Sequence, residues 1–401
     1  MSVPAISVEQ IALGDRRLQT FVDLPYRLLH GDPCWTPPLR ADFLGSRLLS
    51  TVGLLTPAHP YHAQAEVTHF IARRNGEPVG RISAAVNRRF NEYHGVRVGS
   101  FGFMDFVEDY AVAEALLDRA REWVADRGMT VFRGPGEYSN ATHERQGVLI
   151  DGLEHPPVVE LTHNPPHYGA FLDRYGLAKA MDYLAYRLDL EAPMPPRLQE
   201  VAVKVLGRRD IGIVPVDMSR FTEELRKVVR VYNDAWADNW GYLPLTEAEA
   251  DAVADQLKPI VDPGLVRFAY VDGELAAVLG AFPDPYWCLR PRWNRFQDND
   301  AIRVARLLRQ RRHIPRVRLM FFGIRSQFRR LGLDAALFYE VMTYAVGRGY
   351  RECDISLLLE TNKAILQEAD FMQARHYKTW RIYELALDGG SADTGHGGVG
   401  S

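Results

Sequence analysis

The feature that most constrains the fold of this 401-residue chain is an order of elements that occurs twice. Each half contains two alternating apolar segments around a tight turn, first at Asn75-Gly76 and again at Asp272-Gly273. A strand, a helix with a 3.6-residue apolar stripe and an Arg-Gly stop follow, the stops being Arg127-Gly128 and Arg348-Gly349. A further strand, helix and aromatic-rich strand close each half. The repeat predicts two copies of one mixed α/β unit.

The boundaries of the two units follow from composition. We expect an N-terminal domain over 1–190, a linker over 191–199, a C-terminal domain over 200–388 and a disordered tail over 389–401. The linker, EAPMPPRLQ, carries three prolines that favour an extended chain, and the tail is of low complexity. The second copy is longer than the first because of a basic insertion at 291–313, in which we expect a short helix around 300–310.

The overall composition excludes several classes of protein. A content of 47% hydrophobic and 25% charged residues is ordinary for a globular protein, and a net charge of -3 argues against DNA or an acidic membrane as a partner. The three cysteines form no CxxC pair, and there is no HExxH motif, so we expect no metal. No apolar stretch reaches the length of about 18 residues needed to span a bilayer. We expect a soluble cytoplasmic protein.

The turn between the central strand and the following helix differs in charge between the copies. In the second copy it reads RSQFRRLGL, with Arg325, Arg329 and Arg330 before Gly332. Unpaired N–H groups at a helix N-terminus attract anions, and a glycine lets a ligand approach the backbone. The first copy reads DFVEDY (105–110), which is acidic and lacks glycine. Only the second turn is therefore predicted to bind a phosphate or pyrophosphate.

The segment 200–388 resembles the GNAT superfamily of acyl-CoA-dependent N-acyltransferases. Arg329-Arg330-Leu331-Gly332-Leu333-Asp334 matches the family pattern Q/R-x-x-G-x-G/A at its first two fixed positions and departs from it at Asp334. Segments such as GDPCWTPPLR, NDAWADNWGYLPLT and HYKTWRIYEL are similar to bacterial proteins with two GNAT folds. The resemblance implies an α/β (α+β) fold of two tandem GNAT-like mixed β-sheet domains with helices on both faces, of which the first has a degenerate phosphate loop.

The resemblance also implies which residues bind the donor, with acetyl-CoA as the default. In the family, loop amides hold the coenzyme A pyrophosphate, and the preceding strand pairs with pantetheine. The predicted cofactor-binding residues are Phe322, Gly323, Ile324, Arg325, Phe328, Arg329, Arg330, Leu331, Gly332, Leu333 and Asn362. Asn362 is equally well explained as the N-cap of the helix that follows it.

The acceptor is expected to be an amine of a small molecule or peptide. The Trp- and Asn-rich segment at 233–242 lies where GNAT folds form part of the acceptor wall, and an aromatic floor with amide groups suits a polar acceptor. The predicted acceptor-binding residues are Asn233, Trp236, Asn239, Trp240 and Tyr242. Core packing is the alternative explanation for one of the two tryptophans.

Direct attack of an amine on a thioester needs a base and an acid but no protein nucleophile. Glu360, at the end of a predicted strand, is the candidate base. Tyr377, Tyr383 and Tyr339 are the candidate acids, and each is equally well explained as a packing residue.

Three functions stay open at this point. The leading one is an acyl-CoA-dependent N-acyltransferase. The second is an acyl-CoA sensor without catalysis. In the third, the arginine-rich insertion docks an acyl carrier protein or an aminoacyl-tRNA as the acyl donor.

Overall fold

The computed structural model describes residues 5–48, 51–138, 145–251, 258–294 and 296–387, so the tail predicted to be disordered lies outside the described residues. The first half of the chain contains β1 (Ile6–Ile11), α1 (Leu18–Leu28), α2 (Arg40–Leu44), β2 (Ala65–Arg74), β3 (Glu77–Asn87), α3 (Arg88–His94), β4 (Val98–Phe106), α4 (Tyr110–Ala125), β5 (Val131–Gly136), β6 (Val148–Asp151), α5 (His167–Tyr175) and β7 (Ala178–Asp189).

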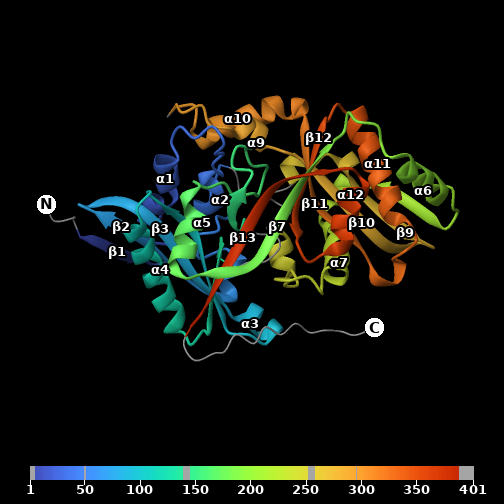
Figure 1. The fold of residues 1–401 in the computed structure, drawn as a ribbon. Helices are drawn as coiled ribbons and strands as arrows, with labels where there is room; N and C mark the ends of the chain where they lie inside the picture. The colour runs from blue at the N-terminus through green and yellow to red at the C-terminus, as the bar shows by residue number, and fades with distance from the viewer. Residues whose placement is uncertain (1–4, 49–50, 139–144, 252–257, 295, 388–401) are drawn as a thin grey trace.

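The second half repeats this order with one insertion. It contains α6 (Pro196–Leu206), β8 (Ile211–Pro215), α7 (Phe221–Ala235), β9 (Val266–Val271), β10 (Glu274–Pro283), α9 (Tyr286–Leu289), α10 (Asp300–Gln310), β11 (Arg316–Ile324), α11 (Leu333–Gly347), β12 (Glu352–Leu359), α12 (Lys363–Phe371) and β13 (Arg375–Ala386). The α/β fold with helices on both faces of a mixed sheet is confirmed (Figure 1).

The two predicted hairpins are confirmed. Strands β2 and β3 pair around Asn75-Gly76, and β9 and β10 pair around Asp272-Gly273. The predicted helix of the insertion is α10, which covers 300–310. One local prediction was wrong, because α6 begins at Pro196, inside the segment expected to be an extended linker. Proline is well tolerated in the first turn of a helix, where its missing N–H would have no partner in any case.

The last strand of each half pairs with the other half. The sheet runs in the order β1-β2-β3-β4-β5-β13-β7-β12-β11-β10-β9-β8. Strand β13, from the end of the chain, is antiparallel to β5, while β7 is antiparallel to β12. Figure 1 shows β7 and β13 side by side in the middle of the molecule. One sheet therefore crosses the boundary between residues 190 and 200, and the division into two domains there stays a prediction.

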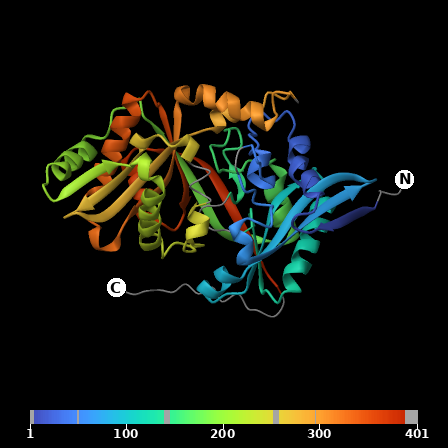
Figure 2. The same ribbon diagram turned by 180° about the vertical axis from the view of Figure 1, so that it is seen from behind.

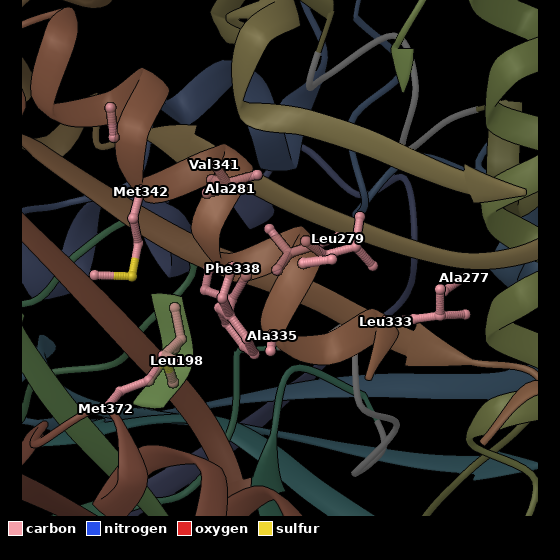
Figure 3. Packing of buried hydrophobic residues seen from close by; sticks show 14 of the residues in the cluster. Leu198, Ala277, Leu279, Ala281, Leu333, Ala335, Phe338, Val341, Met342 and Met372 are labelled. Carbon is pink, nitrogen blue, oxygen red and sulfur yellow. The ribbon is translucent and has the colours of Figure 1, made fainter. Parts of the chain in front are cut away.

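Each face of the sheet carries its own apolar core. Along β9, Phe268 packs on the face that α7 covers, and its neighbour Ala269 packs on the face that α11 covers. This alternation is the period of two that a strand imposes on its side chains. Figure 3 shows the α11 side, where Leu198, Leu279 and Phe338 meet from α6, β10 and α11. Figure 2, seen from behind, shows α7 and α1 on the opposite face.

The arginine-rich insertion packs on the other half of the molecule. The side chain of Arg303, on α10, has 0% exposure. Its guanidinium donates to the carbonyl oxygens of Pro37 (2.5 Å), Pro38 (3.3 Å) and Leu289 (3.0 Å). Arg306 donates to the carbonyl of Cys288 at 2.7 Å. Arg303 therefore holds the two halves together, whereas Arg306 binds a carbonyl group within the second half. The exposed arginines of the described part of the insertion are Arg292, Arg309, Arg311 and Arg312.

Replacing Arg303 with methionine tests this role. We expect the free energy of unfolding to fall by about 2–3 kcal/mol, because buried carbonyl groups lose their donors. Urea denaturation followed by circular dichroism measures the change. Arg309→Met on the exposed side of the same helix is the matched control. Equal stability of the two variants would show that the contacts of Arg303 contribute nothing.

Candidate active site

The predicted anion-binding turn joins the end of β11 to the start of α11. Gly332 is the N-cap of α11 and has a left-handed φ of 77°. A Cβ atom at this position would lie 2.9 Å from Val205 Cγ2 and 3.2 Å from Val201 Cγ1, both on α6. The turn therefore requires glycine for two reasons, the sign of φ and the close packing of α6. Leu333 is buried behind it, and Ile324, Phe328 and Leu331 pack against the same core.

The three arginines of the turn have different surroundings. Arg325 donates to Glu274 Oε1 at 2.8 Å and to the Leu275 carbonyl at 2.9 Å, and it forms an ion pair with Asp234 at 3.4 Å. A contact of Arg325 with the cofactor stays a prediction. Arg329 and Arg330 are exposed, and neither forms an ion pair with any described residue. Two guanidinium groups at this helix N-terminus are thus available to an anion.

A pair of carboxyl groups lies beside the turn. Asp334, in the first turn of α11, hydrogen-bonds to Glu368 on α12. Burial, together with the nearby Asp334 carboxylate, raises the pKa of Glu368 to about 7. Sequence analysis had noted Asp334 as a departure from the family pattern. Because Glu368 is protonated below pH 7, the pair carries at most one negative charge at acidic pH.

This pair predicts a pH dependence of donor binding. As the pH rises through 7, Glu368 ionises beside the turn, and we expect coenzyme A to bind several-fold more weakly at pH 8 than at pH 6. The folded-state pKa lies above the ordinary value of 4.5, so the folded protein binds more protons than the unfolded chain between pH 4.5 and about 7, and stability falls as the pH rises through that range and is constant above it. Glu368→Gln should remove both dependences. Titration calorimetry at the two pH values measures binding, and an unchanged pH profile in the variant would contradict the assignment.

The end of β11, the predicted pantetheine strand, contacts the predicted acceptor wall. The indole Nε1 of Trp236 donates to the carbonyl of Phe322 at 2.9 Å. A Cβ on Gly323 would lie 3.0 Å from that of Ala235, so α7 packs directly on the strand. The ring of Phe322 lies 5.1 Å from that of Phe338 on α11. Residues predicted to bind the acyl donor therefore contact residues predicted to bind the acyl acceptor.

The remaining wall residues link this strand to the other half of the chain. Tyr242 is buried and donates to Asn233 Oδ1 at 3.1 Å, while its own carbonyl contacts His94 Nε2 at 2.7 Å. Trp240 lies under the guanidinium of Arg133, 5.1 Å from the ring centre. Tyr242 and His94 thus pack between the two halves, and an acceptor contact of Tyr242 stays a prediction. An acceptor contact of Trp240 or Asn233 stays a prediction.

Asn362 has the capping role that the sequence offered as an alternative. Its Oδ1 accepts from the N–H of Ile365 at 3.3 Å, at the start of α12. Its Nδ2 lies 3.5 Å from Asn239 Oδ1, which places the cap against the wall segment. A pantetheine contact of Asn362 stays a prediction.

Glu360 lies just beyond the end of β12, where the base was expected. Its Oε2 accepts from Lys179 Nζ at 2.7 Å, and its Oε1 accepts from the N–H of Asp182 at 3.0 Å. Arg381 donates to Asp182 at 2.8 Å. Although burial acts to raise it, the hydrogen bonds from Arg381 and Lys179 lower the pKa of Asp182. Both oxygens of the candidate base are thus engaged by residues of β7.

Two candidate acids, Tyr377 and Tyr383, lie on β13 in different surroundings. Tyr377 donates to Asp354, near the start of β12, and burial raises its pKa well above the usual range. Tyr383 is 1% exposed in the core of the first half, where β13 pairs with β5. Both predictions assumed that β13 stays with its own half. The exchange of strands pairs Tyr383 with Lys179 on β7, whose Nζ lies 2.7 Å from Glu360 Oε2, and a catalytic role of either tyrosine stays a prediction.

Lys179, Asp182 and Arg381 are the site residues that the sequence analysis missed. The first two lie on β7 of the first half, and the crevice is formed mainly by the second half. No local motif marks them, because only the pairing of β7 with β12 brings them to Glu360. The described residues contain no group of His, Cys, Asp and Glu that could hold a metal ion. No helix among those residues is long and apolar enough to cross a membrane.

The chain has a tandem GNAT fold, as solved structures confirm. A tandem GNAT protein from the clavulanic acid biosynthesis pathway matches 96% of this chain and 100% of its own, with a TM-score of 0.54 and 14% identity. A GCN5-related N-acetyltransferase from Sphaerobacter thermophilus matches 97% of this chain and 98% of its own, with a TM-score of 0.52 and 13% identity. No family model matches the sequence.

Curated relatives narrow the class. The bacterial ceramide synthase of Caulobacter vibrioides (strain NA1000 / CB15N) is 32% identical over 378 residues, which cover 92% of this chain and 95% of that protein. Protein YghO of Escherichia coli (strain K12) is 29% identical over 384 residues, 94% of each. The chain belongs to the protein family of the Caulobacter ceramide synthase, and it is an acyltransferase.

Proposed function

We propose that this enzyme transfers a fatty acyl group from coenzyme A to the amine of a long-chain amino alcohol. The observation that carries the proposal is the 32% identity, over 92% of the chain, to a protein named a bacterial ceramide synthase. A ceramide is the amide of a fatty acid and a sphingoid base. This chemistry replaces acetyl-CoA, the default donor expected from the superfamily, by a long-chain acyl-CoA.

The proposed donor site is the turn before α11. Arg329 and Arg330 would pair with the pyrophosphate, and backbone N–H groups at the start of α11 would bind its oxygens. The pantetheine arm would extend along the end of β11, past Phe322. Trp236, whose indole already donates to the Phe322 carbonyl, would line this path.

In the proposed reaction the amine nitrogen attacks the thioester carbonyl carbon. The carbon–sulfur bond then breaks, the nitrogen loses a proton, and the thiolate takes one up. We propose that Glu360 orients the amine at the end of β12 and that Lys179 and Asp182 hold its carboxylate in place. An acceptor that arrives as an ammonium ion first releases one proton to water, because only the neutral amine has the lone pair for the attack.

The test is product formation with defined donors. Purified full-length protein is incubated with sphinganine and either palmitoyl-CoA or acetyl-CoA, and mass spectrometry measures the amide. We expect N-palmitoyl product to form at least tenfold faster than N-acetyl product. A preference for acetyl-CoA would overturn the long-chain donor but not the acyl transfer. Binding of acyl-CoA without any amide would instead favour the sensor function, for which the engaged oxygens of Glu360 are an argument.

A further inference from the structure

The C-terminal end of α7 contacts both the end of β11 and the turn that follows it. We call residues 325–332 the donor turn, because the proposed acyl-CoA site lies there. Trp236, the C-cap of α7, donates to the carbonyl of Phe322 on β11. Asp234, two residues earlier, directs its carboxylate to the start of the donor turn, and its side chain is 26% exposed. One helix end therefore holds the strand and the turn together.

Both carboxylate oxygens of Asp234 are engaged by the first two residues of the donor turn. Oδ1 accepts from the N–H of Ser326 at 3.0 Å, and Oδ2 lies 3.4 Å from Nε of Arg325. A second carboxylate, Glu274 at the start of β10, accepts from Arg325 at 2.8 Å and from Gln327 Nε2 at 3.1 Å. These contacts of Glu274 are with side chains, so Asp234 is the carboxylate that holds the backbone of the turn.

The later part of the donor turn has three backbone N–H groups that can bind an anion. No described residue accepts from the N–H groups of Arg330, Leu331 and Gly332. Arg330 has a left-handed φ of 66°, and Gly332 has one of 77°. Successive N–H groups in a turn of this kind form a concavity that binds anions. A non-glycine residue keeps a left-handed conformation only where the surrounding structure fixes it, so the shape of this concavity depends on how the turn is held.

The negative charge of Asp234 by itself opposes donor binding. A carboxylate beside the turn repels the pyrophosphate of coenzyme A, and so does Glu274. Arg325 offsets part of this charge, but its guanidinium is already paired with the two carboxylates. A benefit of Asp234 to donor binding must therefore come from its hydrogen bond to the N–H of Ser326. Charge and geometry thus predict opposite effects on donor binding when the carboxylate is removed.

We propose that Asp234 is a positioning residue for acyl transfer. Its Oδ1 fixes the backbone at Ser326, so that the three N–H groups further along the turn keep the arrangement that binds the donor pyrophosphate. The N–H of Arg329 donates to the Ser326 carbonyl at 3.4 Å, which links Ser326 to the later part of the turn. The inference rests on the proposed function, because it takes the donor turn as the acyl-CoA site. Since Trp236 lies at the same helix end, α7 also holds the donor turn in register with the predicted acceptor wall.

Two substitutions of Asp234 separate its geometry from its charge. Asp234→Asn keeps an oxygen that accepts from the Ser326 N–H but loses the charge, whereas Asp234→Ala loses both. We expect Asp234→Ala to raise KM for palmitoyl-CoA about tenfold, as for the loss of one hydrogen bond, with kcat within about twofold of the wild type. Asp234→Asn should bind the donor at least as tightly as the wild type. Titration calorimetry with coenzyme A on the full-length protein should give the same order of affinities.

Substitutions of Ser326 test the same hydrogen bond from its donor side. Ser326→Pro removes the N–H, and proline is tolerated at the first position of a helical turn such as 326–328. Arg325 already has the extended conformation that a following proline requires, with φ -59° and ψ 143°. Ser326→Ala keeps the N–H and is the control. We expect Ser326→Pro to weaken coenzyme A binding as Asp234→Ala does, and the double variant to bind no more weakly than either, since each removes the same interaction.

Hydrogen–deuterium exchange reports the state of the turn in the absence of a donor. In the peptide that covers 321–331, exchange should be faster in Asp234→Ala than in the wild type and unchanged in Asp234→Asn. Glu223→Ala is the matched control, because it removes an exposed carboxylate from the other end of α7. Both exchange and coenzyme A binding should be unchanged in this control.

The outcomes separate this inference from the proposed function. Coenzyme A binding that is unchanged or tighter in Asp234→Ala would overturn the positioning role and leave the donor site intact. Equal weakening in Asp234→Asn and Asp234→Ala would overturn the role of the hydrogen bond. Absence of coenzyme A binding to the wild type would overturn the donor site itself and this inference with it. If Asp234→Ala does not fold, the comparison of Ser326→Pro with Ser326→Ala decides.

Discussion

Arg329→Glu, alone and together with Arg330→Glu, will strongly reduce acyl transfer without loss of the fold. Both side chains are exposed and pair with no described residue, so the folded state loses no contact. The reversed charges repel the donor pyrophosphate at the start of α11. Each charge-assisted hydrogen bond contributes about 1.5–3 kcal/mol, so we expect kcat/KM for acyl-CoA to fall roughly 100-fold in the single variant and further in the double one.

Gly332→Ala tests the backbone of the same turn, whereas the arginine variants test its charges. The φ of 77° and the 2.9 Å approach to Val205 Cγ2 force the turn away from α6 when a side chain is added. We expect a loss of about 1–3 kcal/mol in stability as well as weaker donor binding.

For the Arg329→Glu variant, the matched control for charge is Arg309→Glu on the exposed side of α10. Donor binding by titration calorimetry that persists in Arg329→Glu would show that this turn does not hold the donor.

The sequence predicted the fold well because its repeat is encoded locally. The hairpin turns at Asn75-Gly76 and Asp272-Gly273 and the helix at 300–310 depend on residues close in the chain, and the structure has them where expected. The contrast between the two strand-to-helix turns is also local. The structure gives Gly332 two requirements that the sequence analysis did not state, a left-handed φ and the close packing of α6, while the approach of a ligand stays a prediction.

The exchange of β7 and β13 had no such local signal. Both strands are rich in aromatic residues, and either would pair with the last strand of either half, since a pattern of alternating apolar residues does not specify its partner strand. The candidate acids Tyr377 and Tyr383 were assigned to the crevice on the assumption that β13 stays in its own half. For the same reason, Lys179 and Asp182 could not be assigned to it. Long-range pairing thus decides which side chains reach Glu360.

The same strand holds a lysine whose burial the sequence did not predict. Lys378, between Tyr377 and Trp380, has 0% exposure, and its Nζ has no hydrogen-bond partner among the described residues. The nearest compensation is the faces of two aromatic rings, with centres 5.7 Å and 5.5 Å from Nζ. Burial lowers the pKa of Lys378 to about 7, despite the opposite effect of the Asp354 carboxylate. Such a side chain destabilises the folded state whenever it must be charged.

Lys378→Met will therefore stabilise the protein. The unfolded chain keeps the ordinary lysine pKa of 10.5, so between pH 7 and that value it binds more protons than the folded protein. The stability of the wild type accordingly falls as the pH drops from 10.5 towards 7 and is constant below. At about 1.4 kcal/mol for each pKa unit, the cost at pH 7 is on the order of 4 kcal/mol, and we expect methionine to recover 2–4 kcal/mol of it.

Chemical denaturation of both proteins at several pH values measures the effect. The gain of Lys378→Met should be largest at pH 7 and should shrink towards zero near pH 10, whereas Lys363→Met, at an exposed lysine, should change stability little at any pH. A pH-independent gain would instead indicate better apolar packing. A loss of stability would mean that the ammonium is paired in solution, most directly with Asp354. Because Asp354 already accepts from Tyr377 and Ser356, that pairing would have to displace one of two existing hydrogen bonds.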